Sequence, residues 1–299
     1  MTAAELMEVP VAGGRLTVGA WGPAEGPVVV AAHGITSSHV FWTLVGEELA
    51  ADGIRLVAPD LRGRGLSADL PGPSSIPRHA GDLMAVLDHL GVQRALVVGH
   101  SMGGFVAAVA AVGHPDRVAA TLLVDGGPPL SEPLGPDTDV QAALHAIIGP
   151  SLERLRQTFA SRAVYRAFWH SHPAFAAVPA WLVDAYADHD LVAADRGGWR
   201  SRVVEARIVE DARGTLTDPQ VYTAVDRIDG PVAMLYAPRG ILDGPTGLYP
   251  SEVVQAACAR QPRLETAVVP DTNHFTIGMS PHGAEAVASA ILDLLEQHT

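Results

Sequence analysis

Residues 95–104, Ala-Leu-Val-Val-Gly-His-Ser-Met-Gly-Gly, decide the fold class of this 299-residue chain. The apolar run at 95–98 predicts a buried strand, and the Ala- and Val-rich stretch at 105–112 predicts a helix packed tightly on a sheet. Between them, Gly99-x-Ser101-x-Gly103 places a serine on a sharp turn from strand to helix. Such a turn strains the serine backbone, exposes its Oγ and needs glycines where other backbone comes close. Because the motif alone is weak evidence, its place between strand and helix is what predicts a nucleophilic Ser101.

Short apolar runs alternate with amphipathic stretches on both sides of this turn. Apolar runs predict strands at 28–32, 54–58, 121–124, 232–237 and 266–269, and helical spacing predicts helices at 76–90, 251–259 and 283–297. This alternation is typical of an α/β domain with a mostly parallel sheet flanked by helices.

The alternation stops between residues 128 and 227. This region shows no clear strand, carries most of the aromatic residues, and has helical patterns at 140–148, 152–163 and 181–188. We therefore predict a core domain formed by residues 1–127 and 228–299, with a helical cap inserted at 128–227. In the cap, Phe168 and Trp169 are candidates for lining a substrate site, although packing of the cap onto the core is the preferred interpretation of either aromatic.

A serine nucleophile needs a base, because a free hydroxyl reacts poorly at neutral pH. Among 13 histidines, His274 follows the last predicted strand, in a loop that opens at the same carboxyl edge of the sheet as Ser101. His274 is therefore the predicted base. His33 is interpreted as part of a structural His-Gly turn, and His100 as packing under the serine turn. The remaining histidines that we assign to surface or capping positions are His79, His89, His114, His282 and His298.

Two aspartates are candidates for the carboxylate that orients His274. Asp125 directly ends the predicted strand 121–124, but an aspartate before Gly-Gly is also a common turn former. Asp243 follows the strand 232–237 after the loop Pro238-Arg239-Gly240-Ile241-Leu242, which is late for a residue projecting from a strand end. The sequence leaves both residues open.

Composition excludes several classes of function. The net charge of −13 repels nucleic acid phosphates and anionic lipid headgroups, so we expect no nucleic acid partner, no membrane partner and a small-molecule substrate. All 20 basic residues are arginines, which excludes Schiff-base chemistry and a Ser–Lys dyad. His170 and His172, without a cluster of carboxylates or cysteines beside them, are poor evidence for a metal. We predict neither a metal nor another cofactor.

The termini and the cysteine content bear on location. Residues 1–10 have no basic segment followed by an apolar one, and Cys258 is the single cysteine, so we expect a cytoplasmic enzyme without disulfides. No apolar run approaches the roughly 18 residues that a membrane span needs. The sequence is also compatible with a homo-oligomer.

Several motifs together resemble the α/β-hydrolase superfamily. They are Ser101, His274, His33-Gly34 after a strand, Asp-Leu-Arg-Gly-Arg-Gly-Leu-Ser at 60–67, and Gly-His-Ser-Met-Gly-Gly at 99–104. The similarity covers about residues 10–125 and 228–297, and the section between them corresponds to the family's variable cap.

This resemblance implies roles for further residues. It makes the backbone N–H of Ile35 a second oxyanion donor, beside that of Met102 at the start of the helix after Ser101. It makes the 60–67 loop largely structural, with Arg62 tying turns together. The family often places its acid a few positions earlier than Asp243, whereas some members use the earlier strand, which ends here at Asp125.

The expected function is hydrolysis of an uncharged, hydrophobic ester or lactone through a Ser-His-Asp triad and an acyl-enzyme. Carbon–carbon bond hydrolases, thioesterases, amidases and perhydrolases use the same constellation, so they remain alternatives. Epoxide hydrolases and dehalogenases of this family fit less well, because they need a carboxylate where Ser101 stands. A protein of another class, a small-molecule receptor of hydrolase fold that does not turn over its ligand, also remains open.

Overall fold

The computed structural model describes residues 4–130, 132–135 and 139–298. Its centre is an eight-stranded sheet in the order β1-β2-β4-β3-β5-β6-β9-β10. The strands are β1 Glu5–Val11, β2 Gly14–Trp21, β3 Val28–Ala32, β4 Arg55–Pro59, β5 Ala95–His100, β6 Val118–Val124, β9 Val232–Tyr236 and β10 Leu264–Val268. Every pairing from β4 to β10 is parallel, whereas β2 pairs antiparallel with both β1 and β4. The predicted α/β class and mostly parallel sheet are therefore confirmed.

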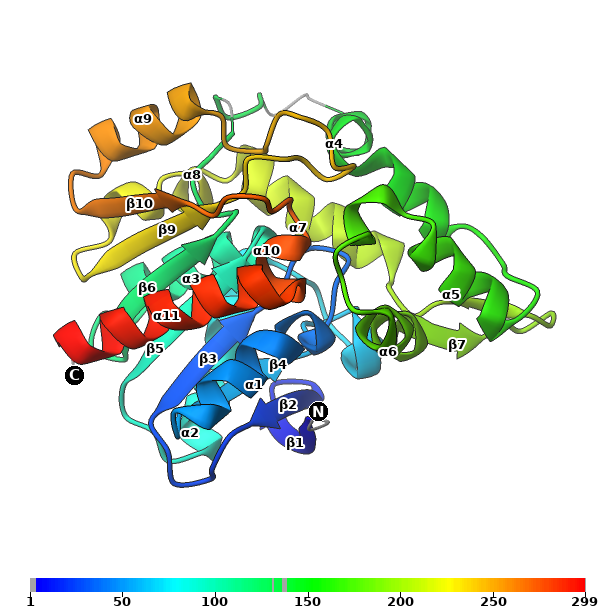
Figure 1. The fold of residues 1–299 in the computed structure, drawn as a ribbon, viewed down its shortest axis with the longest axis horizontal. Helices are drawn as coiled ribbons and strands as arrows, with labels where there is room; N and C mark the ends of the chain where they lie inside the picture. Colours follow the sequence, from blue (N-terminus) through cyan, green and yellow to red (C-terminus); the bar gives the residue numbers. More distant parts are fainter. Residues whose placement is uncertain (1–3, 131, 136–138, 299) are drawn as a thin grey trace.

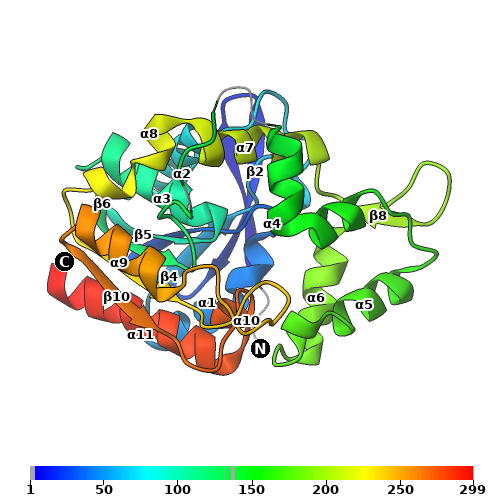
Figure 2. The same ribbon diagram turned by 90° about the horizontal axis from the view of Figure 1, so that it is seen from above.

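Helices cover both faces of the sheet (Figures 1 and 2). On one face lie α1 Thr43–Ala51, α10 Thr276–Met279 and α11 Pro281–His298, and on the other lie α2 Ile76–His89, α3 Met102–Gly113, α8 Pro219–Tyr222 and α9 Ser251–Arg260. The middle strands are continuous apolar runs because both of their faces are buried, and all six residues of β5 are buried.

The segment between β6 and β9 carries the helices that project beyond the sheet (Figure 1). It contains α4 Val140–Leu155, α5 Arg162–His170, α6 Ala180–Asp190 and α7 Glu205–Thr217. The helices predicted at 140–148 and 152–163 are wrong in their bounds: one helix runs through to Leu155 with a kink at Ile148, and the next begins at Arg162. The expectation of no strands here is also wrong, because β7 Leu191–Ala193 and β8 Trp199–Ser201 form a short antiparallel pair.

The 60–67 loop holds the α/β layers together. The guanidinium of Arg62 is fully buried and donates two hydrogen bonds to the Asp82 carboxylate on α2. It also donates to the carbonyl oxygens of Ala12 and Pro71. Arg62 therefore ties two separate turns and a helix to the end of β4, which is the structural role that the resemblance implied.

Candidate active site

Ser101 occupies a strained turn between β5 and α3. Its backbone angles, φ 55° and ψ −121°, are ones that side chains rarely adopt. The turn is possible because the flanking residues are glycines: a Cβ on Gly99 would lie 1.9 Å from the Gly103 carbonyl oxygen. A Cβ on Gly103 would lie 2.1 Å from the carbonyl oxygen of Ala32 on β3. The predicted nucleophile turn is therefore formed, and Ser101 lines a pocket at the carboxyl edge of the sheet.

His274 and Asp125 meet beside this turn. The His274 Nδ1–H donates to Asp125 Oδ2 at 2.6 Å, and both side chains are buried. The other Asp125 oxygen accepts the backbone N–H of Ala237 at 3.1 Å, which fixes the plane of the carboxylate. The residue after Asp125 touches the serine turn, since a Cβ on Gly126 would lie 2.5 Å from the Cα of Ser101. Among the described residues Ser101 Oγ has no hydrogen bond to His274, and such bonds often form fully only with substrate present.

Asp243 contacts Asn273, the residue that precedes His274 in the sequence. Its carboxylate accepts a hydrogen bond of 2.8 Å from Asn273 Nδ2 and lies 3.3 Å from the Arg239 Nε. Asn273 Oδ1 in turn accepts the backbone N–H groups of Phe275 and Thr276, so the amide fixes the loop that carries His274. Of the two candidate acids that the sequence left open, Asp125 is hydrogen-bonded to His274. Asp243 is instead hydrogen-bonded to the side chain of Asn273.

The two predicted oxyanion donors, Ile35 and Met102, line the same pocket as Ser101. Met102 begins α3, so its N–H is one of the helix's unpaired N-terminal donors. A Cβ on Gly34 would lie 3.2 Å from the Ser101 Cβ, which shows how closely the chain before Ile35 passes the serine.

Arg64 contacts both of these donor residues. Its Nε donates to the Ile35 carbonyl oxygen at 2.9 Å, and its Nη2 lies 3.7 Å from the Met102 sulfur. Its Nη1 donates to the Asp211 carboxylate of α7 at 2.5 Å. The guanidinium is fully buried, so one fixed group connects the loop that carries Ile35 to helix α7 of the inserted segment.

His33 and His100 are not available for acid–base chemistry. His33 Nε2 accepts the backbone N–H of Leu61 and its Nδ1–H donates to Gly34, an arrangement that only a neutral imidazole satisfies. Burial accordingly lowers the pKa of His33 to about 3. Burial and the nearby His274 likewise lower the pKa of His100, whose ring stacks on Phe41 at 4.0 Å and donates to the His274 carbonyl oxygen. Both histidines are structural, as predicted.

The surface assignment of His79 is wrong. Its side chain is fully buried between α2 and α7, where its Nε2 lies 3.0 Å from the Asp211 carboxylate and 3.0 Å from the Ser74 hydroxyl. The sequence pattern could not reveal this, because Asp211 lies 132 positions further along the chain.

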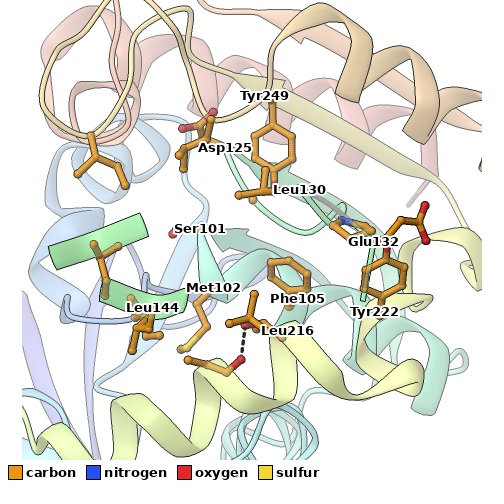
Figure 3. A pocket seen from close by; sticks show the side chains of 18 residues that line it. Ser101, Met102, Phe105, Asp125, Leu130, Glu132, Leu144, Leu216, Tyr222 and Tyr249 are labelled. Carbon is orange, nitrogen blue, oxygen red and sulfur yellow. Dashed lines mark hydrogen bonds between the residues drawn. The ribbon is translucent and has the colours of Figure 1, made fainter. Parts of the chain in front are cut away.

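The pocket has a volume of about 130 Å³ and mostly apolar walls (Figure 3). The core contributes Met102, Phe105 and Tyr249, while Leu144 of α4 and Leu216 of α7 close it from the inserted segment. Its few polar groups include the Glu132 carboxyl and the Tyr222 hydroxyl, which lie together at one end in Figure 3.

Phe168 and Trp169, the predicted substrate contacts, do not line this pocket, which other residues form. Trp169 is buried, with its ring centroid 4.8 Å from that of Phe175, and Phe175 lies 4.9 Å from Phe275 of the core. Phe168 packs against this cluster. These aromatic residues hold the inserted helices on the core. The residues that line this pocket are scattered through the sequence and show no local pattern.

Metal-ligating groups do not converge in the pocket among the described residues. His170 is exposed and hydrogen-bonded to Asp184, whereas His172 is turned toward Trp169 and Phe175, so the two histidines do not form a shared site. Within the described ranges, no helix is both long and apolar enough to cross a membrane.

Comparison with known proteins identifies the family. The family model described as "alpha/beta hydrolase fold" matches residues 27–166. "Putative carbamate hydrolase RutD" of Variovorax paradoxus is 30% identical over 217 residues, 68% of this chain and 74% of that protein. The "Bifunctional esterase/perhydrolase DCH" of Acinetobacter calcoaceticus is 38% identical over 111 residues, 37% of this chain and 40% of that protein.

Solved structures agree on the fold. The crystal structure of E-2-(acetamidomethylene)succinate hydrolase superposes with a TM-score of 0.78 over 98% of this chain and 99% of that one, at 24% identity. The first three curated relatives are matched over only 31–40% of their own lengths. Fold, motifs and relatives lead to one conclusion: the chain belongs to the α/β-hydrolase fold family.

Proposed function

We propose that this protein is a serine hydrolase that cleaves an uncharged ester or lactone, with Ser101 as nucleophile, His274 as base and Asp125 as the orienting acid. The observation that carries the proposal is the strained Ser101 turn beside a buried His274–Asp125 hydrogen bond of 2.6 Å. The two features have little structural value apart from each other, since a strained serine backbone and a buried carboxylate both cost stability.

The mechanism follows from the hydrogen bond that already occupies one nitrogen of the His274 ring. Asp125 binds His274 Nδ1, so Nε2 is the nitrogen that accepts the Ser101 proton as Oγ attacks the carbonyl carbon. The backbone N–H groups of Met102 and Ile35 stabilise the oxyanion, and one such donor contributes about 2.7–4 kcal/mol. His274 then protonates the leaving alcohol and later activates the water that releases the acyl group.

The walls of the pocket support an apolar acyl or ring group. Phe105, Leu144 and Leu216 offer no hydrogen bond to a polar substrate, and the Glu132 carboxyl at one end disfavours an anionic one. The net charge of −13 repels anions in the same way. Tyr249 adds no charge, because burial and the nearby Asp125 hold its pKa well above the usual value.

Turnover of p-nitrophenyl acetate and butyrate tests the proposal. Ser101→Ala is expected to lower kcat by about 10⁶-fold, as in other serine hydrolases that lose their nucleophile. Ser289→Ala, on the exposed face of α11, is the matched control and should leave kcat unchanged. If the wild type binds these esters without multiple turnover, the protein is a receptor of hydrolase fold. If Ser101→Ala retains turnover, another residue is the nucleophile.

A further inference from the structure

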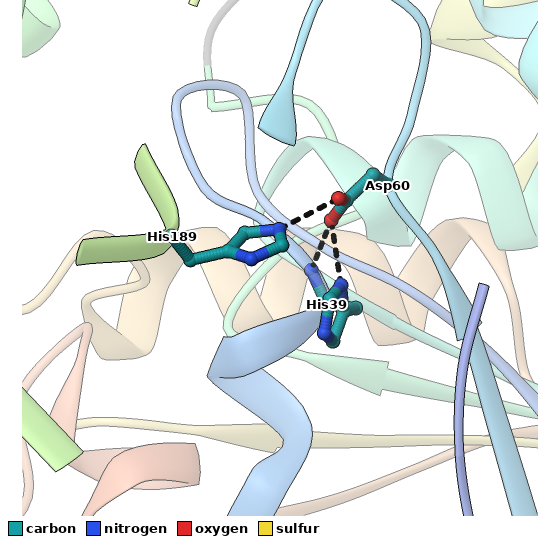
Figure 4. A group of neighbouring side chains, drawn as sticks. All are labelled: His39, Asp60 and His189. Atoms are coloured by element: carbon teal, nitrogen blue, oxygen red, sulfur yellow. Dashed lines mark hydrogen bonds and ion pairs between the residues drawn. The ribbon is translucent and has the colours of Figure 1, made fainter. Parts of the chain in front are cut away.

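A second group of chemically active side chains lies where the inserted helices meet the core (Figure 4). His39 belongs to the short helix η1 His39–Trp42, Asp60 follows β4, and His189 comes from the last turn of α6. His39 Nδ1 lies 2.9 Å from Asp60 Oδ1, and His189 Nε2 lies 2.7 Å from Asp60 Oδ2. The three ligand atoms all lie within 4.8 Å of one another.

We propose that His39, Asp60 and His189 bind a divalent transition-metal ion of the Zn²⁺ type, which clips α6 to the core. Two imidazole nitrogens and a carboxylate oxygen are a donor set that Zn²⁺ prefers, with water completing four-fold coordination. Ligand atoms bound at about 2.0–2.2 Å around a tetrahedral ion lie roughly 3.4 Å apart. The two N–O separations, 2.9 Å to Oδ1 and 2.7 Å to Oδ2 of Asp60, are shorter than this by about 0.5–0.7 Å, so each must open by that amount to admit an ion.

The surroundings of Asp60 prepare it as a ligand. The backbone N–H of His39 donates to Oδ1 at 2.9 Å and that of Leu66 donates to Oδ2 at 2.8 Å, so the carboxylate plane is fixed in advance. The Asp60 side chain is fully buried, and a bound cation would neutralise the charge of its carboxylate.

An ion can also reach the site from solvent. His39 and His189 both line an open groove of about 520 Å³, together with Val40, Thr43 and Trp181. The active-site pocket has different walls, so the clip is separate from the proposed ester chemistry and does not depend on it.

Isothermal titration of tag-free protein, stripped with EDTA, with ZnCl₂ tests the proposal. The wild type is expected to bind one Zn²⁺ per chain and to show a higher Tm when saturated. His189→Gln, at the partly exposed position, should weaken binding by about 100-fold or more and abolish the Tm shift. His282→Gln removes an exposed histidine of α11 and should change neither. Absence of stoichiometric binding, or equal affinity in His189→Gln, overturns the proposal.

X-ray absorption at the zinc edge gives a second test that needs no variant. The zinc-loaded wild type is expected to show two imidazole nitrogens and oxygen donors at about 2.0–2.2 Å. A first shell with one imidazole or none would contradict the site, whatever the affinity. Because neither experiment measures esterase activity, its result is independent of the proposed function.

Discussion

The acid of the proposed triad differs from its rival in how its side chain is buried. Asp125 is fully buried, accepts from His274 Nδ1 at 2.6 Å and has its second oxygen fixed by Ala237, whereas Asp243 is partly exposed and paired with Arg239. Sequence alone could not decide between them, because both follow strands that end at the same edge of the sheet. The distance to His274 is a tertiary property that no local pattern encodes.

Asp125→Asn is therefore expected to lower kcat for p-nitrophenyl butyrate by about 10³–10⁴-fold, because an amide donor in place of the carboxylate favours the wrong histidine tautomer. Asp243→Asn should lower kcat by less than about 10-fold, since it acts on His274 only through Asn273. Steady-state kinetics of both variants makes the comparison. A larger loss in Asp243→Asn would assign the acid role to Asp243.

The Arg64–Asp211 pair is fully buried, with Ser74 and His79 also bound to the Asp211 carboxylate. Burial alone would raise the pKa of Asp211, but Arg64 and His79 hold it below the usual value. Asp211→Asn leaves a buried guanidinium unpaired, so we expect the free energy of unfolding to fall by about 3–5 kcal/mol. Urea denaturation measures this. Glu205→Gln, on the same helix and paired with the exposed Arg156, should cost far less, and equal losses would contradict the account.

Among the elements, all the strands with parallel neighbours were predicted, including the edge strand β10, whereas β1, β2, β7 and β8 were not. Strands β3, β5 and β6 are continuous apolar runs because helices cover both of their faces. The edge strand β1 is mostly exposed, and β7 and β8 have three residues each, so none of them carries a recognisable pattern. The Ser101 turn and His274 were predictable since their chemistry imposes local motifs, whereas the pocket walls depend on how distant helices pack.

Helix α7 forms one wall of the pocket through Ala212, Thr215 and Leu216. Leu216→Phe adds bulk to this wall, so kcat/KM should fall more for p-nitrophenyl butyrate than for the acetate. We expect the butyrate-to-acetate ratio to drop by about 10-fold, the scale on which a hydrophobic pocket discriminates one or two methylenes. Arg213→Ala changes an exposed residue of the same helix and should leave the ratio unchanged. An unaltered ratio in Leu216→Phe would place the acyl group elsewhere.

For the molecule as a whole, the buried neutral histidines His33 and His100 predict that the free energy of unfolding decreases at acidic pH. The pKa of His33 is lowered to about 3, so its contribution to stability is complete above the ordinary histidine value of about 6.5. This contribution is lost as the pH falls from there toward 3, because the unfolded chain binds a proton that the folded chain cannot. His100 acts in the same direction.

Each such histidine should reduce the free energy of unfolding by about 1.4 kcal/mol per pH unit below pH 6. Chemical denaturation between pH 7.5 and 4.5 measures the slope. His33→Gln retains a donor and an acceptor without titrating, so it should make the slope shallower, and His282→Gln should not. Equal slopes in His33→Gln and the wild type would show that His33 does not titrate on unfolding.

The most direct measurement is covalent labelling of the protein with a fluorophosphonate, followed by peptide mapping. An activated serine reacts with this probe, whereas an ordinary hydroxyl does not. The account predicts a single adduct on Ser101, absent in Ser101→Ala and strongly slowed in His274→Ala. Labelling of a different residue, or undiminished labelling in His274→Ala, would contradict the assignment of Ser101 and His274 as nucleophile and base.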